Sequence, residues 1–269
     1  MSKREDPMLL TAERLFAVEG LVTIVTGAAS GLGLAISRTM AANGADLILV
    51  DRNETELRRI GEEIIPGAEI ATVDVADPDA IRRTVDDVIA RKGRLDVMFA
   101  NAGISGGAGI RLPQGHIENV DFAAWNDVIA INQTGAFATI QAAARHMKAQ
   151  RGGRIVVTAS VGGLRGSAAT AYAYAAAKAA VVNLVRQAAL ELATFDVQVN
   201  AIAPGFFRTG LGGGRLLDEA ATAPLHAMVP MNRLGIPDEI AGVSLLLASP
   251  AASYITGSVF TVDGGITAA

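Results

Sequence analysis

The feature that most constrains this chain is the alternation of short apolar runs with longer amphipathic stretches. The runs are rich in Val and Ile and lack polar alternation, so both faces of each should be buried, as in a parallel sheet covered by helices. The expected strands are Val22–Thr26, Asp46–Val50, Glu69–Val73, Leu95–Ala100, Arg154–Thr158, Val197–Ala203 and Ser258–Val262. The expected helices are Gly31–Asn43, Glu54–Ile64, Pro78–Lys92, Phe122–Gln150, Thr170–Thr194 and Pro237–Ala248. The alternation predicts an α/β fold, a doubly wound parallel sheet of seven strands.

No Pro/Gly/Ser-rich linker and no internal repeat divides the 269 residues. We therefore expect residues 21–269 to form a single domain, preceded by an N-terminal extension over residues 1–20.

The chain is apolar for a soluble protein, with 51% hydrophobic residues, 19% charged residues and a mean hydropathy of +0.36. Its longest uncharged run, 23 residues between Glu239 and Asp263, is long enough to span a membrane. Ser249 and Pro250 interrupt it, however, so a buried helix, a turn and a buried strand are expected instead, with no membrane span. The remaining apolarity points to subunit contacts.

Charge and cysteine content exclude other classes. The net charge of −4 and the pI near 5.4 argue against binding to nucleic acid. The absence of cysteine excludes disulfides and thiolate chemistry and fits a cytoplasmic protein. His116, His146 and His226 share no metal-ligand spacing, so we expect no catalytic metal.

A glycine-rich turn follows the first expected strand, where the next helix opens. Gly27, Gly31 and Gly33 would let the backbone approach a pyrophosphate, and the helix N-terminus would offer N–H groups to it. Ser30 and Leu32 belong to the same turn. Strand, tight turn and helix in this order predict a dinucleotide site.

Asp51 ends the second expected strand, 18 residues after Gly33. A carboxylate near this spacing accepts hydrogen bonds from the adenosine ribose and repels a 2′-phosphate, which favours NAD over NADP. Arg52 follows directly and could hold a phosphate, so the preference stays open.

Tyr174 and Lys178 are spaced i, i+4 and should lie on one helix face. A neighbouring ammonium stabilises a phenolate, so we expect Lys178 to lower the pKa of Tyr174 and make it a usable acid/base. Ser160 follows the fifth expected strand at the ligand-binding edge of the sheet. Of the nearby hydroxyls, Thr158 lies inside that strand and Ser167 too close to the tyrosine helix, so Ser160 is preferred.

From Leu15 to Gly265 the chain resembles the short-chain dehydrogenase/reductases of about 250 residues, which implies a Rossmann-like sheet with helices on both faces. Residues 26–33 match their TGxxxGxG pattern. Asp74, followed by Val75, matches the aspartate that contacts adenine. Asn101, Ala102 and Gly103 match a motif that supports the sheet beside the cofactor, and Pro204, Gly205, Phe207 and Thr209 match the segment over the nicotinamide.

The resemblance implies a catalytic tetrad of Asn132, Ser160, Tyr174 and Lys178, in which Tyr174 exchanges the substrate proton. Ser160 would hold the substrate oxygen, Lys178 the nicotinamide ribose, and Asn132 a water in a proton relay. Arg233–Gly235 and Asp263–Gly265 match C-terminal landmarks of the family. Ser160 and Tyr174 are 14 apart, one more than the commonest spacing, and the extra residue is expected to loop out within Gly162–Ser167.

These features predict an NAD-dependent oxidoreductase that interconverts a secondary alcohol and a ketone. Two alternatives stay open, an NADPH-linked 3-oxoacyl-(carrier protein) reductase and a catalytically silent NAD-binding scaffold. A nucleotide-sugar epimerase or dehydratase is disfavoured by the glycine spacing and the lack of a C-terminal substrate domain.

The substrate should contact three segments, Ile104–Val120, Val161–Ala169 and Phe206–Met231, and the last of these is a candidate lid. Relatives commonly form homotetramers through the long alanine-rich helices, and we expect the same here.

Overall fold

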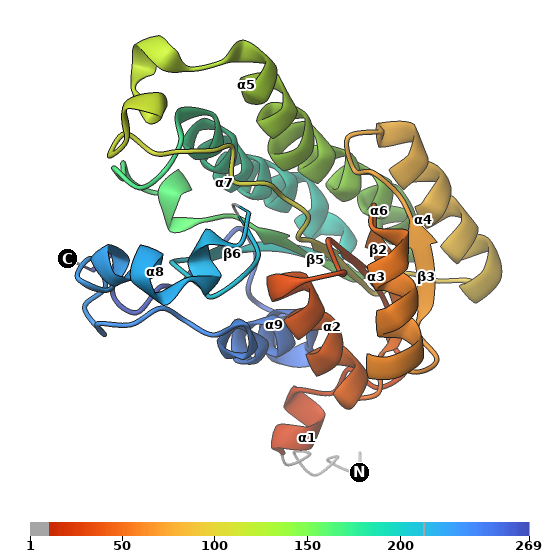
Figure 1. Cartoon of the computed structure of the whole chain (residues 1–269). Helices are drawn as coiled ribbons and strands as arrows, with labels where there is room; N and C mark the ends of the chain where they lie inside the picture. The colour runs from red at the N-terminus through yellow and green to blue at the C-terminus, as the bar shows by residue number, and fades with distance from the viewer. Residues whose placement is uncertain (1–10, 212, 269) are drawn as a thin grey trace, which may run out of the picture.

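The computed structural model describes residues 11–211 and 213–268, which contain one seven-stranded parallel sheet (Figure 1). The strand order is β3-β2-β1-β4-β5-β6-β7. The strands are β1 (Val22–Thr26), β2 (Asp46–Asp51), β3 (Glu69–Thr72), β4 (Val97–Ala100), β5 (Gly153–Thr158), β6 (Val197–Pro204) and β7 (Val259–Val262). The order reverses between β1 and β4, and ligands bind at the carboxyl edge beside such a switch point.

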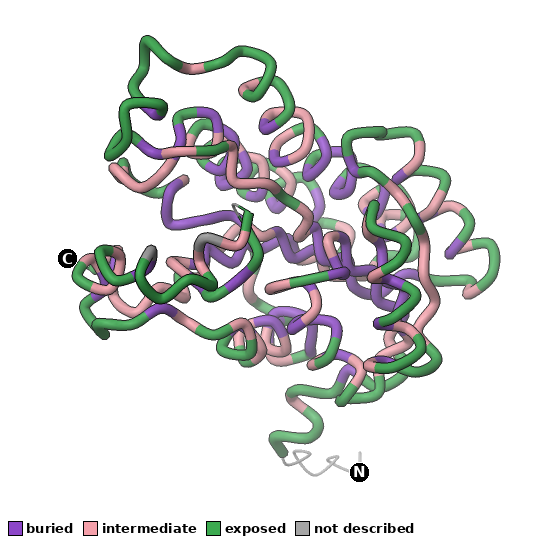
Figure 2. The backbone as a smooth tube through the Cα atoms, in the orientation of Figure 1, coloured by how far each residue is buried: buried purple, intermediate pink, exposed green. Residues whose placement is uncertain are grey.

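Helices cover both faces of the sheet, as the apolar strands require (Figures 1 and 2). One core lies under α4 (Pro78–Lys92), α6 (Ala136–Gln150) and α7 (Tyr172–Leu192). The other lies under α2 (Gly31–Ala42), α3 (Glu54–Arg59) and α9 (Ala241–Ala248). The predicted α/β fold class is therefore confirmed, and all seven predicted strands are present.

Element ends depart little from the prediction, but three expected helices change register internally. The expected helix Pro237–Ala248 begins as a 3₁₀ turn (Pro237–Ile240) and continues as α9. The stretch 122–150 is α5 (Phe122–Ile129), a π-helical turn (Ala130–Gly135) and then α6. A Cβ on Gly135 would lie 2.8 Å from the Val75 carbonyl oxygen, so the backbone packs closely on another segment where the helix widens. A second π turn (Ile60–Ile64) ends the stretch that begins with α3.

Two short helices were not predicted. They are α1 (Ala12–Leu15) and α8 (Glu219–His226), and α8 carries Pro224 inside the helix. α1 lies within the expected extension 1–20, of which residues 1–10 fall outside the described part of the chain.

The long uncharged run folds as expected into a helix (α9), a 3₁₀ turn (Pro250–Ala252) and a strand (β7). Within residues 11–211 and 213–268, no helix combines the length and apolarity needed to cross a membrane.

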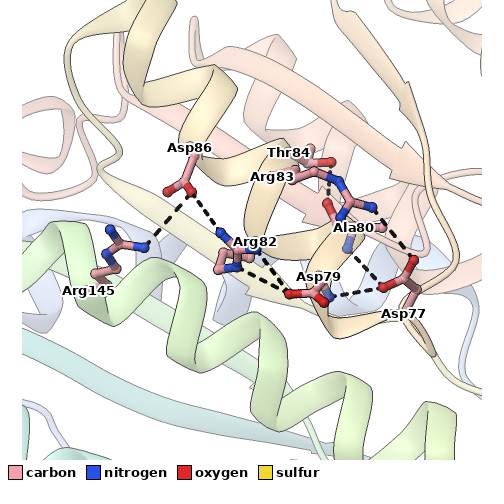
Figure 3. A network of polar contacts seen from close by, with 8 residues as sticks. All are labelled: Asp77, Asp79, Ala80, Arg82, Arg83, Thr84, Asp86 and Arg145. Carbon is pink, nitrogen blue, oxygen red and sulfur yellow. Dashed lines mark hydrogen bonds and ion pairs between the residues drawn. The ribbon is translucent and has the colours of Figure 1, made fainter.

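A polar network joins α4 to α6 (Figure 3). Asp77 caps α4 by accepting hydrogen bonds from the backbone N–H groups of residues 79 and 80. Further along α4, Asp86 lies 2.6 Å from His146 Nε2 and 4.0 Å from Arg145, both on α6. The hydrogen bond from His146 holds the pKa of Asp86 below its usual value. These contacts fix α6, and α6 continues from the π turn that carries Asn132.

Candidate active site

The glycine-rich turn after β1 is shaped by close backbone packing. Gly27 has a φ of +68°, and a Cβ there would lie 2.8 Å from the Ala102 Cα. A Cβ on Gly33 would collide with the Gly27 carbonyl oxygen and lie 2.6 Å from Asn101 Nδ2. Both positions therefore require glycine, and the turn is pressed against the segment that follows β4.

The N-terminus of α2 faces this turn without a side-chain cap. Ser30 occupies the N-cap, is exposed and makes no capping hydrogen bond, while Leu32 in the first turn is half-buried. Uncapped first-turn N–H groups are the donors that a pyrophosphate accepts from. The residues present therefore fit a dinucleotide cofactor.

The segment after β6 crosses the turn. Pro204 ends β6, and the Gly205 N–H donates to the Val262 carbonyl at 2.9 Å. Phe207 is buried and pairs with Gly235 through a β-bridge. The Thr209 side chain is buried and lies 3.4 Å from where a Gly31 Cβ would stand. The predicted Pro204–Thr209 segment thus lies against the glycine-rich turn.

The ends of β2 and β3 carry the acidic residues. Asp51 accepts backbone hydrogen bonds from Ala29 at 3.1 Å and from Asn53 at 3.0 Å, which fixes its carboxylate beside the turn. Arg52 is exposed. Asp74 is also exposed and accepts from the Ala76 N–H, while Val75 beside it is buried.

Asn101 connects β1, β4 and β5. Its Nδ2 donates to the Thr26 carbonyl at 3.1 Å, and its own N–H donates to Thr26 Oγ1 at 3.0 Å. The Ala102 N–H also donates to Thr26 Oγ1. Gly103 follows, and a Cβ there would lie 3.1 Å from Asn132 Oδ1. The predicted Asn101–Gly103 motif therefore lies between the glycine-rich turn and the tetrad.

The structure brings Ser160 and Tyr174 together. Ser160 is buried, its Oγ accepts from the Gly162 N–H at 3.1 Å, and it is hydrogen-bonded to the Tyr174 side chain. Lys178, one turn along α7, has its Nζ 5.8 Å from the centre of the Tyr174 ring. Lys178 is 3% exposed, and its ammonium donates to the Thr158 carbonyl at 2.6 Å.

Burial sets the titration of both groups on α7. It raises the pKa of Tyr174, against the smaller lowering effect of the Ser160 hydrogen bond. It lowers the pKa of Lys178 to about 8. The expectation that Lys178 lowers the tyrosine pKa is therefore wrong for this structure, because burial dominates and the ammonium is directed to a backbone carbonyl.

Asn132 is completely buried in the π turn between α5 and α6. Its side-chain amide pairs with both backbone groups of Ile104, so it anchors the start of the loop after β4. This places all four tetrad residues at the carboxyl edge of β4 and β5.

The substrate-side loops pack on one another. The Arg111 N–H donates to the Ala168 carbonyl at 3.2 Å, which joins the long loop after β4 to the loop that follows Ser160. The pKa of Asp263 is lowered because hydrogen bonds from Thr267 and from the Gly265 N–H outweigh its desolvation, and the charge of Arg165 in the latter loop adds a smaller lowering effect. Arg208 forms an ion pair with Glu219 at 3.4 Å across the candidate lid.

The structure also shows an important residue that sequence reasoning set aside. The Thr158 carbonyl accepts a hydrogen bond from Lys178 Nζ, and the Thr158 hydroxyl donates to Asn101 Oδ1 at 2.9 Å.

Across residues 11–211 and 213–268, no three or more His, Asp or Glu side chains gather as a metal site would require.

Comparison with known proteins gives long matches. A family model described as enoyl-(acyl carrier protein) reductase matches residues 27–267. The chain is 40% identical over 249 residues to a cis-4-hydroxycyclohexanecarboxylate dehydrogenase of Sinomonas cyclohexanicum, covering 92% of this chain and 96% of that protein. It is 37% identical over 252 residues to a 3-oxoacyl-[acyl-carrier-protein] reductase of Thermotoga maritima, covering 93% and 98%.

A solved structure agrees along nearly the whole chain. A gluconate 5-dehydrogenase from Burkholderia cenocepacia, in complex with NADP and tartrate, superposes with a TM-score of 0.86 at 33% identity, covering 96% of this chain and 100% of that one. Together with the residues at the carboxyl edge of the sheet, these matches show that the chain belongs to the short-chain dehydrogenase/reductase family, whose members are NAD(P)-dependent oxidoreductases.

Proposed function

We propose that the protein interconverts a secondary alcohol and a ketone with NAD as its preferred cofactor. The observation that carries this proposal is the hydrogen-bonded pair of Ser160 and Tyr174, with Lys178 one helical turn away. The pair lies at the carboxyl edge of the sheet, beside a glycine-rich turn that fits a dinucleotide.

In this proposal the pyrophosphate would be held by the residues of the turn, Gly27, Ser30, Gly31, Leu32 and Gly33. Asp51 and Arg52 would hold the adenosine ribose, and Asp74 and Val75 would contact the adenine. The residues Pro204, Gly205, Phe207 and Thr209 would lie over the nicotinamide, and the segment Asn101–Gly103 would support the sheet beside the cofactor. A bound nicotinamide supplies hydride to the carbonyl carbon, or accepts it from the carbinol carbon.

The protein's own groups move the proton. Tyr174 donates its phenolic proton to the ketone oxygen as the alcohol forms, and in the reverse direction its phenolate takes the hydroxyl proton. The Ser160 hydroxyl donates to the same oxygen and stabilises the charge that develops there. Lys178 would hold the nicotinamide ribose, and Asn132 would keep a water in the relay from Lys178 to solvent, as the family resemblance implies.

Tyr174 is half-buried, and the desolvation of its phenol bears on the direction of the reaction. Its raised pKa keeps the phenol protonated at neutral pH, and the protonated phenol is the form that reduces a ketone. Oxidation of the alcohol needs the phenolate and is therefore favoured at higher pH.

Asp51 supports NAD over NADP, because its fixed carboxylate would repel a 2′-phosphate. The alternative is an NADPH-linked 3-oxoacyl-(carrier protein) reductase. The Thermotoga maritima relative and exposed Arg52 favour that alternative. The Sinomonas cyclohexanicum relative favours a small secondary alcohol, since a hydroxyl on a cyclohexane ring is one.

We also propose a cytoplasmic homotetramer. A groove of about 320 Å³ runs between α6 and α7. Apolar side chains, half-exposed Phe137 among them, line it together with Gln141, Arg145, Lys148, Gln187 and Glu191. Ala144 and Ala188 line it, and alanines let helices of two subunits approach closely.

The experiment that tests the function is a panel of secondary alcohols, hydroxy acids, polyols and ketones, followed at 340 nm with NADH and NADPH. Tyr174→Phe should lose about 100-fold or more in turnover while still binding the cofactor. Tyr172→Phe, two residues earlier on the same helix, is the matched control and should stay active. A Tyr174→Phe variant with near-normal turnover would refute the assignment, and no turnover with any alcohol would favour the silent scaffold.

A further inference from the structure

We infer that Thr158 is a positioning residue that couples the place of Lys178 to the shape of the glycine-rich turn. Its carbonyl oxygen holds the lysine and its hydroxyl holds Asn101. The inference rests on the proposed function only in giving Lys178 a part in the reaction.

The carbonyl of Thr158 is the acceptor for a buried charge. Lys178 Nζ donates to it at 2.6 Å, and the lysine is 3% exposed. An ammonium taken out of water is costly unless a polar group accepts its hydrogen bonds. The position of this carbonyl, at the last residue of β5, therefore sets where the lysine ammonium rests.

The hydroxyl of Thr158 determines how Asn101 is oriented. It donates to Asn101 Oδ1 at 2.9 Å, which leaves Nδ2 to face the opposite way. Nδ2 then donates to the Thr26 carbonyl at 3.1 Å and to the Gly27 carbonyl at 3.4 Å. An amide has one oxygen and one NH₂, so the donor from Thr158 selects the orientation in which NH₂ meets the turn.

The turn is closely packed on the side chain of Asn101. The place where a Gly33 Cβ would stand is 2.6 Å from Asn101 Nδ2, and the place for a Gly27 Cβ is 3.1 Å from the same atom. A continuous path of hydrogen bonds and close contacts therefore runs from the pyrophosphate turn through Asn101 and Thr158 to the lysine. A shift at either end moves the other, because rigid, close-packed groups transmit displacement.

Substitutions can separate the role of the Thr158 hydroxyl from that of the Thr158 backbone carbonyl. Thr158→Val keeps the shape, the β-branching and the backbone carbonyl but removes the hydroxyl donor, and Thr158→Ser keeps the donor. Thr23→Val is the matched control. Thr23 is a buried threonine at the amino end of β1, and its hydroxyl donates to the Leu21 carbonyl, remote from the site.

Two measurements report on the coupling without any substrate. The first is the Kd for NADH, from the fluorescence of the dinucleotide. The second is an NMR titration of ¹³C-lysine side chains, which follows Lys178 directly and is assigned with Lys178→Met. The spectrum is simple because the chain has four lysines, Lys3, Lys92, Lys148 and Lys178.

Thr158→Val should weaken NADH binding about 3- to 10-fold, because Asn101 loses the donor that orients it. It should also lower the titration midpoint of Lys178 by about half a pH unit or more, since the acceptor for the ammonium is less firmly held. Thr158→Ser should stay within about twofold and 0.2 pH unit of the unaltered protein. Thr23→Val should change neither quantity, whatever it does to the melting temperature.

The inference is overturned if Thr158→Val retains both the NADH affinity and the lysine titration of the unaltered protein. It is equally overturned if Thr158→Ser behaves like Thr158→Val, because the hydroxyl would then not be responsible. Failure of the proposed reaction would appear separately, as an absence of alcohol-dependent NADH formation by the unaltered protein.

Discussion

Asn132 and Ile104 are joined by two hydrogen bonds between one side chain and one residue's backbone. Asn132 Oδ1 accepts from the Ile104 N–H at 2.8 Å, and Asn132 Nδ2 donates to the Ile104 carbonyl at 2.7 Å. The amide thereby replaces the strand partner that the backbone lacks once β4 has ended. The family resemblance implies a proton-relay role for Asn132, and the structure shows that the same side chain also holds the start of the substrate-side loop at Ile104.

Removal of this amide should cost stability as well as activity. Asn132→Ala leaves both backbone groups of Ile104 without their partner and should lower the free energy of unfolding by about 2–4 kcal/mol. Asn126→Ala, an exposed asparagine on α5, should change it by less than about 0.5 kcal/mol. Urea titrations of the two variants make the comparison, and equal losses would show that the amide has no such anchoring role.

The lowered pKa of Lys178 predicts how its contribution to stability depends on pH. Its pKa falls from 10.5 to about 8 on burial, so the unfolded chain binds the proton more tightly than the folded protein. The cost of burying the charge is fully present below about pH 8 and is relieved as the pH rises toward 10.5. The stability of the unaltered protein relative to Lys178→Met should therefore rise across this range, by up to about 3 kcal/mol.

Lys92 provides a control of opposite sign. Hydrogen bonds to Asp46 and Glu69 raise its pKa, so its favourable contribution is present at lower pH and lost as the pH rises through the raised pKa. Unfolding free energies of Lys178→Met and Lys92→Met at matched pH values test both signs. A Lys178 contribution that stays constant between pH 8 and 10.5 would contradict the burial argument.

Asp51 should control the choice of dinucleotide. Asp51→Asn keeps the shape of the side chain but removes the charge that repels a 2′-phosphate. We expect kcat/KM for NADPH relative to NADH to rise about 10-fold or more. Asp74→Asn alters the carboxylate after the next strand and should leave that ratio unchanged, since the adenine is common to both cofactors. A ratio that does not respond to Asp51→Asn would favour the carrier-protein reductase alternative.

The groove between α6 and α7 should be closed by another subunit. Light scattering at micromolar concentration should give about four times the chain mass of 27.7 kDa. Ala188→Glu places a charge in the groove and should reduce the assembly, because burying an unpaired carboxylate is costly. Ala123→Glu, on an exposed part of α5, should leave the mass unchanged. A monomeric mass for the unaltered protein would refute the proposed tetramer.

Most of the fold could be predicted because each strand is buried on both faces and reads as an uninterrupted apolar run. The π turn at Ala130–Gly135 could not, since its hydrogen-bond register depends on how closely Gly135 packs on Val75, a contact between distant segments. α8 was missed because proline inside a short alanine-rich stretch resembles a loop.

The predicted catalytic and cofactor-binding positions are brought to one edge of the sheet, although their roles remain proposals. The direction of the Tyr174 pKa shift was mispredicted. The i, i+4 spacing shows that Tyr174 and Lys178 are close, but it shows neither how far Tyr174 is desolvated nor that the Lys178 ammonium bonds to the Thr158 carbonyl. Thr158 was set aside as a strand residue. Its importance depends on which way Asn101 faces, and no local pattern in the sequence encodes that orientation.

The bonds of Asn101 also have a consequence for how the protein is made. They join the turn after β1 to residues far along the chain, across separations of 75 residues to Thr26 and 57 to Thr158. A nascent chain that ends before residue 158 lacks the hydroxyl that orients Asn101 against the turn, and closing such long loops is slow. The full capacity to bind dinucleotide should therefore emerge late in synthesis, after the fifth strand has joined the sheet.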